Sequence, residues 1–261
     1  MIRTLCIVTL LVIAACSTTP ATNPTAFPYE IDREALAANP IKSVIIAHVS
    51  IGGVTRSYLQ PEEARIDKKI KDYLEDNGIK VLPQRGFEQK WKKAVRIYGS
   101  PVDPTTGRMN QKAFVQSLVA VRDGLAENER PDGIVFTDLL EQETSFSGGL
   151  KHLARWHGVT RKPTLQGPGS GVSADHDWLK PVDAVSLWIN IYDMELKRVF
   201  SSIGGLDTVQ AIDTRSSSGR MVRRRNLLES ESHIREGIQL AFHPFIVMDG
   251  YPGPDRPSVA N

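Results

Sequence analysis

Cysteine is nearly absent from the chain, which has two cysteines among its 261 residues. Both fall at the start, where Cys6 lies within an apolar run and Cys16 directly follows that run. Residues 17–261 therefore offer no thiol for a disulfide or for a cysteine-ligated metal. Their stability must come from an ordinary hydrophobic core, and a chain of this length with 41% hydrophobic residues is large enough to bury one.

Long apolar runs and an excess of one charge are also lacking. The longest apolar run, from Leu5 to Ala15, has 11 residues, whereas a membrane-spanning helix needs about 20. The 32 basic and 30 acidic residues give a net charge of +2, so the basic excess typical of nucleic-acid-binding domains is missing. We therefore expect neither a transmembrane helix nor a nucleic-acid partner.

The N-terminus does contain the pattern of an export signal. Arg3 precedes the apolar run, whose length is typical of a secretory signal, and Ala14 and Ala15 lead directly into Cys16. This ending resembles the lipobox of bacterial lipoproteins, in which the cysteine is acylated and becomes the new amino terminus. The resemblance implies a signal peptide over residues 1–15 and lipidation of Cys16. An ordinary secretory signal, in which Cys16 is incidental, is the alternative.

The residues that follow predict a tethered domain. Two or three acyl chains hold a protein at a membrane almost permanently, because each buried methylene contributes about 0.8 kcal/mol. Ser17 is not the aspartate that resembles an inner-membrane retention signal, which favours the outer membrane with the domain facing the periplasm. We assign residues 16–30 to the anchor and a flexible tether, 31–250 to a single periplasmic domain, and 251–261, with its prolines, to a disordered tail.

Strand and helix patterns alternate through the first half of the domain. Residues 41–50 are a β-branched run typical of a buried strand, and residues 79–82 resemble a second, shorter strand. Between them Pro61 opens a helical stripe that ends at Asn77-Gly78, which predicts a β-α-β unit with a helix crossing over the sheet. Further helices are expected over residues 31–38, from Phe87 to Gly99 and over 111–126. The last has the following residues on or beside its buried face: Phe114, Val115, Leu118, Val119, Arg122 and Leu125.

The second half is richer in strand patterns. In chain order we expect a strand at 133–141, its antiparallel partner at 150–160, a mobile excursion at 162–180, a hairpin of 183–194 with 198–203, and a final helix at 227–242. The prediction is an α/β fold tending to α+β, with a single mixed sheet flanked by helices. Its predicted element order is β-α-β-α-α-β-β-β-β-α.

Three segments, residues 66–85, 131–142 and 186–205, carry a family resemblance. They resemble the periplasmic domain shared by the curli-secretion lipoprotein, the lipoprotein activators of penicillin-binding proteins and the amino-terminal domain of the Tol translocation protein. Asp193 matches the aspartate of the family's hairpin, whereas Asp138 stands where a glycine is common and Glu195-Leu196-Lys197 replaces the usual Thr-Gly turn. The resemblance implies protein binding in the periplasm and brings no catalytic residues.

Histidines and carboxylates supply the candidate metal ligands. His152, His157 and His176 are the candidates, and Asp175 and Asp177 flank the last of them. Residues five apart on one strand point to opposite faces, so His152 and His157 are expected to diverge. We therefore predict no metal and no cofactor.

Motifs for catalysis are weak. The glycine-rich residues 167–171 lack the preceding strand, the following helix and the lysine of a phosphate loop. No G-x-S-x-G elbow surrounds any serine, although a Ser-His-Asp triad with distant members stays open. We predict no catalytic residue and a non-enzymatic protein. A periplasmic hydrolase and a small-ligand-binding lipoprotein are the alternatives.

The excursion at 162–180 is the predicted partner-binding segment. Trp178 is its strongest candidate for a partner contact, together with Asp175 and His176, because tryptophan often anchors protein interfaces. The basic run of Arg220 and Arg223 to Arg225 is interpreted as a solvated loop, since Glu229, Glu231 and Glu236 follow closely. The predicted function is that of a lipid-anchored cell-envelope lipoprotein that binds an unidentified envelope protein in assembly or regulation.

Overall fold

The computed structural model describes residues 28–47, 58–103, 106, 108–126, 130–146, 152–169, 171–172, 176–215 and 219–248. The predicted signal peptide, the predicted lipidation site Cys16, residues 17–27 of the tether and the tail at 251–261 lie outside these residues. Asp175, one of the three predicted partner contacts, also lies outside them.

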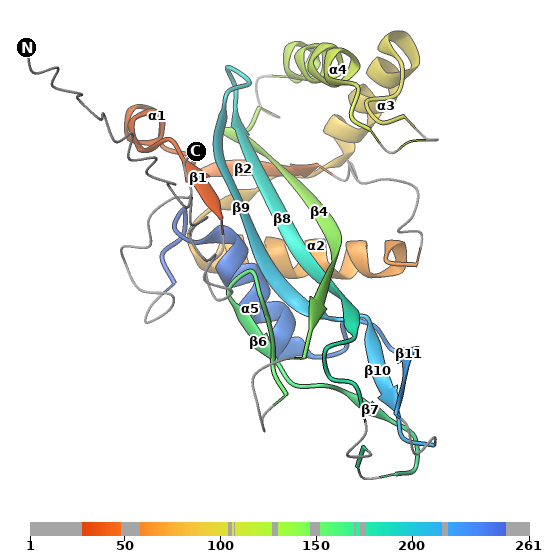
Figure 1. The fold of residues 1–261 in the computed structure, drawn as a ribbon. Coiled ribbons are helices and arrows are strands. Elements are labelled where there is room, and N and C mark those ends of the chain that lie inside the picture. Colours follow the sequence, from red (N-terminus) through yellow and green to blue (C-terminus); the bar gives the residue numbers. More distant parts are fainter. Residues whose placement is uncertain are drawn as a thin grey trace, which may run out of the picture.

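A six-stranded mixed sheet runs through the centre of the molecule (Figure 1). β2 pairs in parallel with β3 and with β4, and the other neighbouring strands are antiparallel. The predicted α/β class, a mixed sheet flanked by helices, is confirmed. From edge to edge the strands are β1 (Tyr29–Ile31), β9 (Arg198–Thr208), β8 (Pro181–Asp193), β4 (Gly133–Ser145), β2 (Ser43–Ala47) and β3 (Lys80–Val81).

The predicted β-α-β unit builds one side of this sheet. α2 (Gln60–Asp76) has Pro61 in its first turn, where the missing N–H breaks no helical hydrogen bond. The helix ends at Asn77, and Gly78 takes φ +79°, a left-handed conformation that glycine adopts without strain. The chain then enters β3 parallel to β2, so α2 crosses over the sheet as predicted.

Helices pack on both faces of the sheet because its central strands are apolar on both sides. On β2, Val44 and Ile46 belong to the core formed with α2 and with α5 (Glu231–Phe242). Ile45 and Ala47 belong instead to the core formed with α3 (Arg85–Tyr98) and α4 (Gln111–Gly124). Alternate residues of this strand thus face two different cores, and a third core lies around Phe146, Trp156 and Val159. Figure 1 shows α3 and α4 together at one end of the molecule.

Two helix predictions need correction. Val115, which the apolar stripe places on or beside the buried face, is 47% exposed, because α4 turns Ala113, Ser117 and Val121 inward instead. The last helix, α5, begins at Glu231 rather than near residue 227. Its first turn is capped by the Ser230 hydroxyl, which accepts a hydrogen bond from the backbone N–H of His233 at 3.3 Å.

The predicted hairpin of residues 183–194 and 198–203 is confirmed as β8 and β9, which are longer than expected. Its turn is held by Asp193, whose Oδ1 accepts a hydrogen bond from the backbone N–H of Lys197 at 2.8 Å. Leu196 has φ +65°, which is unusual for a leucine and shows how far this turn departs from the Thr-Gly turn of the resembled family.

The prediction that residues 150–160 pair with β4 is wrong. β8 takes that edge of β4 along all thirteen residues, from Gly133 to Ser145. Within 150–160, the described chain forms β5 (Ala154–Trp156), which turns at His157-Gly158 and pairs with β6 (Val159–Arg161). This small hairpin packs on β9, where the N–H of Gly205 donates to the carbonyl of His157 at 2.9 Å.

The segment 162–180 is not the detached excursion that its composition predicts. Its residues Leu165–Gln166 form β7, which pairs in parallel with β10 (Gln210–Asp213), and β10 pairs with β11 (Arg220–Arg223). Backbone N–H groups of Ile212 and Thr214 donate to the carbonyls of Thr164 and Gln166 at 2.8 and 3.0 Å. The fold therefore has two small sheets besides the single sheet predicted.

The start of the described chain also differs from the prediction. Tyr29 and Glu30, assigned to the tether, belong to β1 and pair with β9. The short helix predicted over 31–38 is present as α1 (Arg33–Ala38), with Asp32 capping it. None of the helices among the described residues has the length and apolar character needed to cross a membrane.

Candidate functional site

A groove of about 780 Å³ opens where the β5–β6 hairpin meets the segment that carries β7. We call it the distal groove, because Figure 1 shows β7, β10 and β11 at the end of the molecule opposite α3 and α4. The groove is mainly apolar, with one lysine among its polar groups. Its lining residues are His152, Leu153, Thr160, Lys162, Pro163, Leu165, Val172 and Trp178.

Trp178 forms an aromatic cluster beside the groove. Its indole stacks on the imidazole of His152, with ring centroids 3.6 Å apart and planes inclined by 9°. The ring of His176 meets the indole edge-on at 4.6 Å. His176 is only 6% exposed, so it supports Trp178 from within rather than facing a partner directly. Of the two predicted contact residues that the structure describes, Trp178 lines the groove and His176 does not.

Exposed leucines extend the apolar character of this end. Leu165 on β7 is 43% exposed within the groove, and Leu179, next to Trp178, is 73% exposed. Lys162 adds a positive charge between them and the β5–β6 hairpin. Apolar side chains that remain in water beside a preformed concavity are typical of a binding surface.

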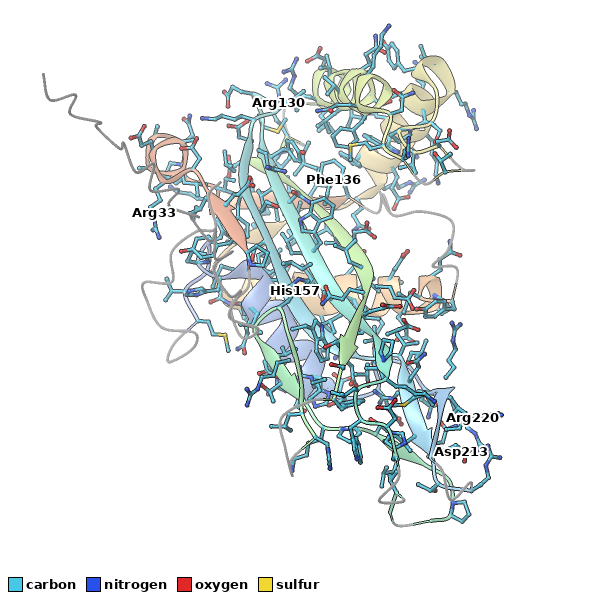
Figure 2. The ribbon with its side chains drawn as sticks, viewed as in Figure 1. Arg33, Arg130, Phe136, His157, Asp213 and Arg220 are labelled. Atoms are coloured by element: carbon cyan, nitrogen blue, oxygen red, sulfur yellow. The ribbon has the colours of Figure 1, made fainter. Side chains whose placement is uncertain are left out.

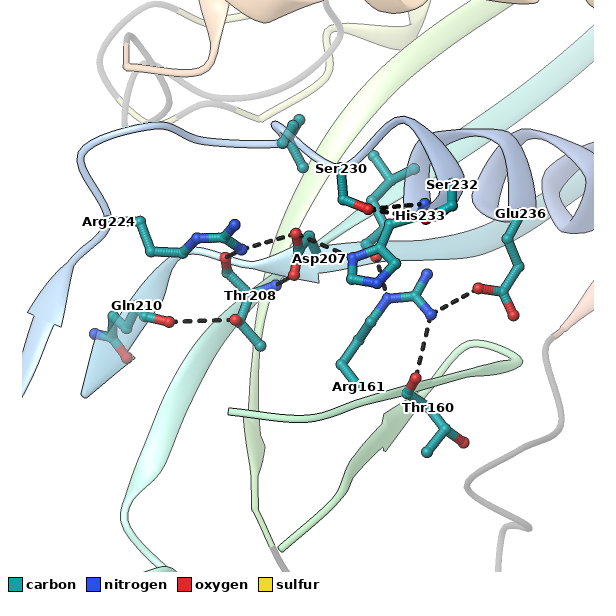
Figure 3. A network of polar contacts seen from close by, with 12 residues as sticks. Thr160, Arg161, Asp207, Thr208, Gln210, Arg224, Ser230, Ser232, His233 and Glu236 are labelled. Carbon is teal, nitrogen blue, oxygen red and sulfur yellow. Dashed lines mark hydrogen bonds and ion pairs between the residues drawn. The ribbon is translucent and has the colours of Figure 1, made fainter. Parts of the chain in front are cut away.

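The groove wall is fastened to the core through Arg161, whose side chain is 3% exposed (Figure 3). Its Nε donates to the carbonyl of Leu206 on β9 at 2.7 Å. Its Nη1 donates to Glu236 Oε2 on α5 at 2.6 Å and to the carbonyl of Thr160 at 3.2 Å. One buried guanidinium thus links β6, β9 and α5, and fixes the neighbouring groove residues Thr160 and Lys162.

A second buried charged group, the carboxylate of Asp207, joins β9, α5 and the segment after β11 (Figure 3). Asp207 at the end of β9 lies 2.7 Å from Nη1 of Arg224 and 3.2 Å from Nδ1 of His233, measured from its Oδ2. Arg224 also donates to the carbonyl of Thr208 at 3.1 Å. Asp207 and Arg224 are both almost completely buried, so this pair ties the segment after β11 to β9 and α5.

These contacts correct the interpretation of the basic run as a solvated loop. Arg220 and Arg223 are the ends of strand β11, and Arg224 is a buried partner of Asp207. The guanidinium of Arg223 lies over the ring of Tyr58, 4.0 Å from its centroid. The run is thus partly a strand and not only a loop; Arg224 is buried, whereas the other three arginines of the run are exposed to solvent as predicted.

His157 and Ser186 share a hydrogen bond of 2.8 Å between Nδ1 and Oγ. Burial lowers the pKa of His157 to about 4, so the imidazole is neutral at physiological pH. Ser186 is completely buried, and a dissolved substrate has no access to its hydroxyl. The pair fixes the turn of the β5–β6 hairpin on β8 and does not have the geometry of an accessible nucleophile and its base.

The three candidate histidines go to different places. His152 stacks in the aromatic cluster, His157 bonds to Ser186, and His176 is buried beside Trp178. His152 and His157 diverge as predicted, but they lie outside the short strand β5 rather than on opposite faces of one strand. Across the part of the chain that the structure describes, no group of three or more histidines, cysteines or carboxylates is placed to hold a metal.

Sequence reasoning missed most of the groove. Leu165 and Val172 carry no periodic pattern that would mark them, and the buried roles of Arg161 and Asp207 depend on pairings between residues far apart in the chain. One signal was present in Gly204-Gly205, because paired glycines within a strand often mark a close approach of another element.

Comparison of the chain with protein-family models, with curated proteins and with solved structures gave no match. The resemblance to the curli-secretion, penicillin-binding-protein-activator and Tol domains therefore rests on the three sequence segments alone.

Proposed function

We propose that this protein is a non-enzymatic, lipid-anchored lipoprotein of the outer membrane that faces the periplasm. Its domain binds another envelope protein during assembly or regulation of the envelope. The observation that carries this proposal is the distal groove, where Trp178 and Leu165 remain partly in water beside a preformed apolar concavity.

The groove suits a protein segment that inserts an apolar side chain. Stacked aromatic rings and a leucine form its apolar wall, and such anchors supply most of the energy of many protein interfaces. Lys162 favours a partner with a carboxylate next to that side chain. Because Arg161 holds the wall rigidly, little ordering entropy is lost on binding.

The proposed anchor leaves the groove free to meet such a partner. Eleven residues lie between Cys16 and Pro28, and a fully extended chain of that length spans about 40 Å. The described chain begins with β1, which Figure 1 shows away from the end that carries β7, β10 and β11. The tether enters the domain at Tyr29, which packs in the same hydrophobic cluster as Trp156 and Val159 of the β5–β6 hairpin, so it is the length of the tether that leaves the groove free to meet a partner.

Site-specific photo-crosslinking in the native envelope tests the groove. A photoreactive residue at Leu165 should capture a discrete partner, whereas the same residue at Val247, which is also strongly exposed, should not. Trp178→Ala should remove the Leu165 crosslink. If both positions capture the same proteins, or if Trp178→Ala changes nothing, the groove is not the partner site.

The anchor is tested separately by Cys16→Ser. Loss of the acylated cysteine should move the protein from the membrane fraction to the soluble periplasmic fraction and abolish incorporation of a lipid label. A variant that still fractionates with membranes and still takes up label would contradict lipidation at Cys16.

A further inference from the structure

The face opposite the distal groove has a distinct charge. We call residues 84–126, which contain α3 and α4, the helical hairpin. This segment has eight Lys or Arg residues and three Asp or Glu residues, a balance of +5 in a chain whose total is +2. The remainder of the chain is therefore net negative, and the positive charge is concentrated at the end of the molecule that Figure 1 shows farthest from β7, β10 and β11.

The outer stripe of α3 is mainly cationic, and the one carboxylate of the helix, the half-buried Glu88, lies at its border. Arg85, Lys92, Lys93 and Arg96 are exposed and recur at helical spacing on the side away from the sheet. Arg108 and Lys112, also exposed, continue this charge across the connection into α4. None of these six residues forms an ion pair with any other residue that the structure describes.

Large apolar side chains stand in water among these cations. Seven large hydrophobic residues are strongly exposed in the described parts of the chain, and four of them belong to the helical hairpin. These four are each between 40% and 63% exposed and lie on either side of the connection between the helices. Ile97 and Tyr98 are the last residues of α3, Met109 lies just before the N-cap of α4, and Val115 lies in the second turn of α4.

Packing of the hairpin does not require these four side chains. Its inner face is held by rings: Trp91 meets Phe87, Phe114 and Phe136 at centroid distances of 5.8 to 6.2 Å. Figure 2 shows Phe136 on the sheet toward the end where the two helices lie, while Arg220 and Asp213 mark the other end. The outer apolar residues are thus free to serve contacts outside the chain.

We propose that the helical hairpin docks on the surface of a bilayer that contains anionic phospholipid. The cations of α3 lie against the head groups, and Ile97, Tyr98, Met109 and Val115 enter the boundary between head groups and acyl chains. Interfacial membrane binding requires this combination, because apolar area and attraction to anionic lipid add together. The proposal concerns a different surface from the distal groove and does not depend on acylation of Cys16.

A bilayer fits these observations better than an acidic protein or a nucleic acid. The exposed apolar residues are close in sequence to the exposed cations, and this mixture of apolar area and positive charge suits the boundary between anionic head groups and acyl chains. The arrangement also agrees with the position of the groove, since a domain docked by α3 and α4 presents the distal groove away from the membrane.

Vesicle co-sedimentation tests the proposal. The chain from Ser17 to Asn261 contains every described element and lacks both the predicted signal peptide and the acylated cysteine. It should bind vesicles of phosphatidylcholine mixed with phosphatidylglycerol, bind phosphatidylcholine alone much less, and dissociate as salt is raised. Because each basic residue near an anionic surface changes binding by about fivefold, the triple variant Lys92→Glu, Lys93→Glu, Arg96→Glu should lose more than tenfold.

A matched control carries the same change of net charge at other exposed positions, Lys68→Glu, Arg155→Glu and Arg220→Glu. It should bind nearly as well as the parent chain, and circular dichroism should show that both triple variants are folded. Equal losses in the two variants, or no binding of the parent chain, would overturn the proposal. If Ile97→Ser with Tyr98→Ser binds vesicles as tightly as the parent, these apolar residues do not enter the bilayer, and the proposed docking is overturned.

Discussion

Arg161 and Glu236 meet at 2.6 Å between Nη1 and Oε2, although 75 residues separate them in the chain. The arginine is buried on β6, and the glutamate lies on the partly exposed side of α5. This ion pair and the hydrogen bond from Arg161 to the carbonyl of Leu206 attach the short β5–β6 hairpin to β9 and α5. The hairpin can therefore form a wall of the distal groove.

Replacing Arg161 should therefore detach the β5–β6 hairpin from β9 and α5 and destabilise the protein. Arg161→Leu leaves the carbonyls of Leu206 and Thr160 without their donor and should lower the free energy of unfolding by about 2 to 4 kcal/mol. Glu236→Gln keeps an oxygen that can accept from Nη1 but removes the charge opposite the buried guanidinium, so it should cost about 1 to 3 kcal/mol. Urea denaturation of both variants measures the difference, and equal small losses would show that Arg161 is not a fastening point.

The second prediction is that shortening the segment 162–180 lowers the stability of the protein. The composition of this segment predicts the opposite, a mobile excursion that adds little to stability. Exchanging Leu165 to Asp177 for a short Gly-Ser link removes β7, whose Gln166 carbonyl accepts a hydrogen bond from the backbone N–H of Thr214. It also removes Gln166 Oε1, which accepts a hydrogen bond from the backbone N–H of Arg225. Each lost hydrogen bond costs about 1 kcal/mol, so the melting temperature should fall by several degrees.

Leu179→Ser is the control for this exchange, since Leu179 is 73% exposed and its loss should leave the melting temperature unchanged. A shortened chain as stable as the parent would mean that the β7–β10 pairing adds nothing to stability. In that case the segment would behave as the detached excursion that its glycines and prolines predict.

The parts of the fold that the sequence predicts are those set by local pattern. α2 is marked by Pro61 at one end and Gly78 at the other, and the β8–β9 hairpin is marked by strict alternation around a polar turn. For these elements the residues that decide the structure are neighbours in the chain. The burial of Val44 and Ile45 on opposite faces follows equally from an apolar strand.

The distal groove could not be predicted because it depends on long-range competition for strand edges. Residues 150–160 have the composition of a strand that could pair with β4, but β8 occupies that edge completely. The displaced segment folds back on itself as β5 and β6, and Arg161 then finds acceptors on β9 and α5. The local sequence around Leu165 and Trp178 contains no pattern that predicts this strand pairing or the contacts of Arg161.

His157 predicts a dependence of stability on pH. Burial depresses its pKa from the ordinary 6.5 to about 4, so the unfolded chain binds a proton more readily than the folded chain between these values. The stability that comes from the neutral imidazole is fully present above pH 6.5 and is lost as pH falls toward 4. The loss from this one group is on the order of 2 to 3 kcal/mol.

His157→Asn isolates this effect. Asparagine tolerates the φ of +35° at this position and retains a group that can bond to Ser186, but it does not titrate. Denaturation midpoints of the two proteins between pH 7 and pH 4 should diverge, with the parent losing more stability. Parallel curves would show that His157 is accessible to protons in the folded state.

Gly205 provides the last prediction, because it lies where the β5–β6 hairpin crosses β9. A Cβ at this position would overlap Cγ2 of Val159 and lie 2.9 Å from the carbonyl oxygen of Trp156. Its neighbour Gly204 faces the other side, where a Cβ would overlap the carbonyl oxygen of Gly237 on α5. The absence of a side chain at the two glycines therefore allows the β5–β6 hairpin and α5 to pack closely on opposite faces of β9.

Gly205→Ala should displace the hairpin and with it the groove residues Thr160 and Lys162, at a cost of about 1 to 3 kcal/mol. α5 and the central sheet should remain folded, because the added methyl group points away from them. Gly204→Ala should instead loosen α5 and cost more, since the atoms it meets are helix backbone that cannot turn aside. Hydrogen exchange separates the two outcomes: faster exchange confined to β5 and β6 in Gly205→Ala supports this division, and faster exchange throughout α5 in that variant contradicts it.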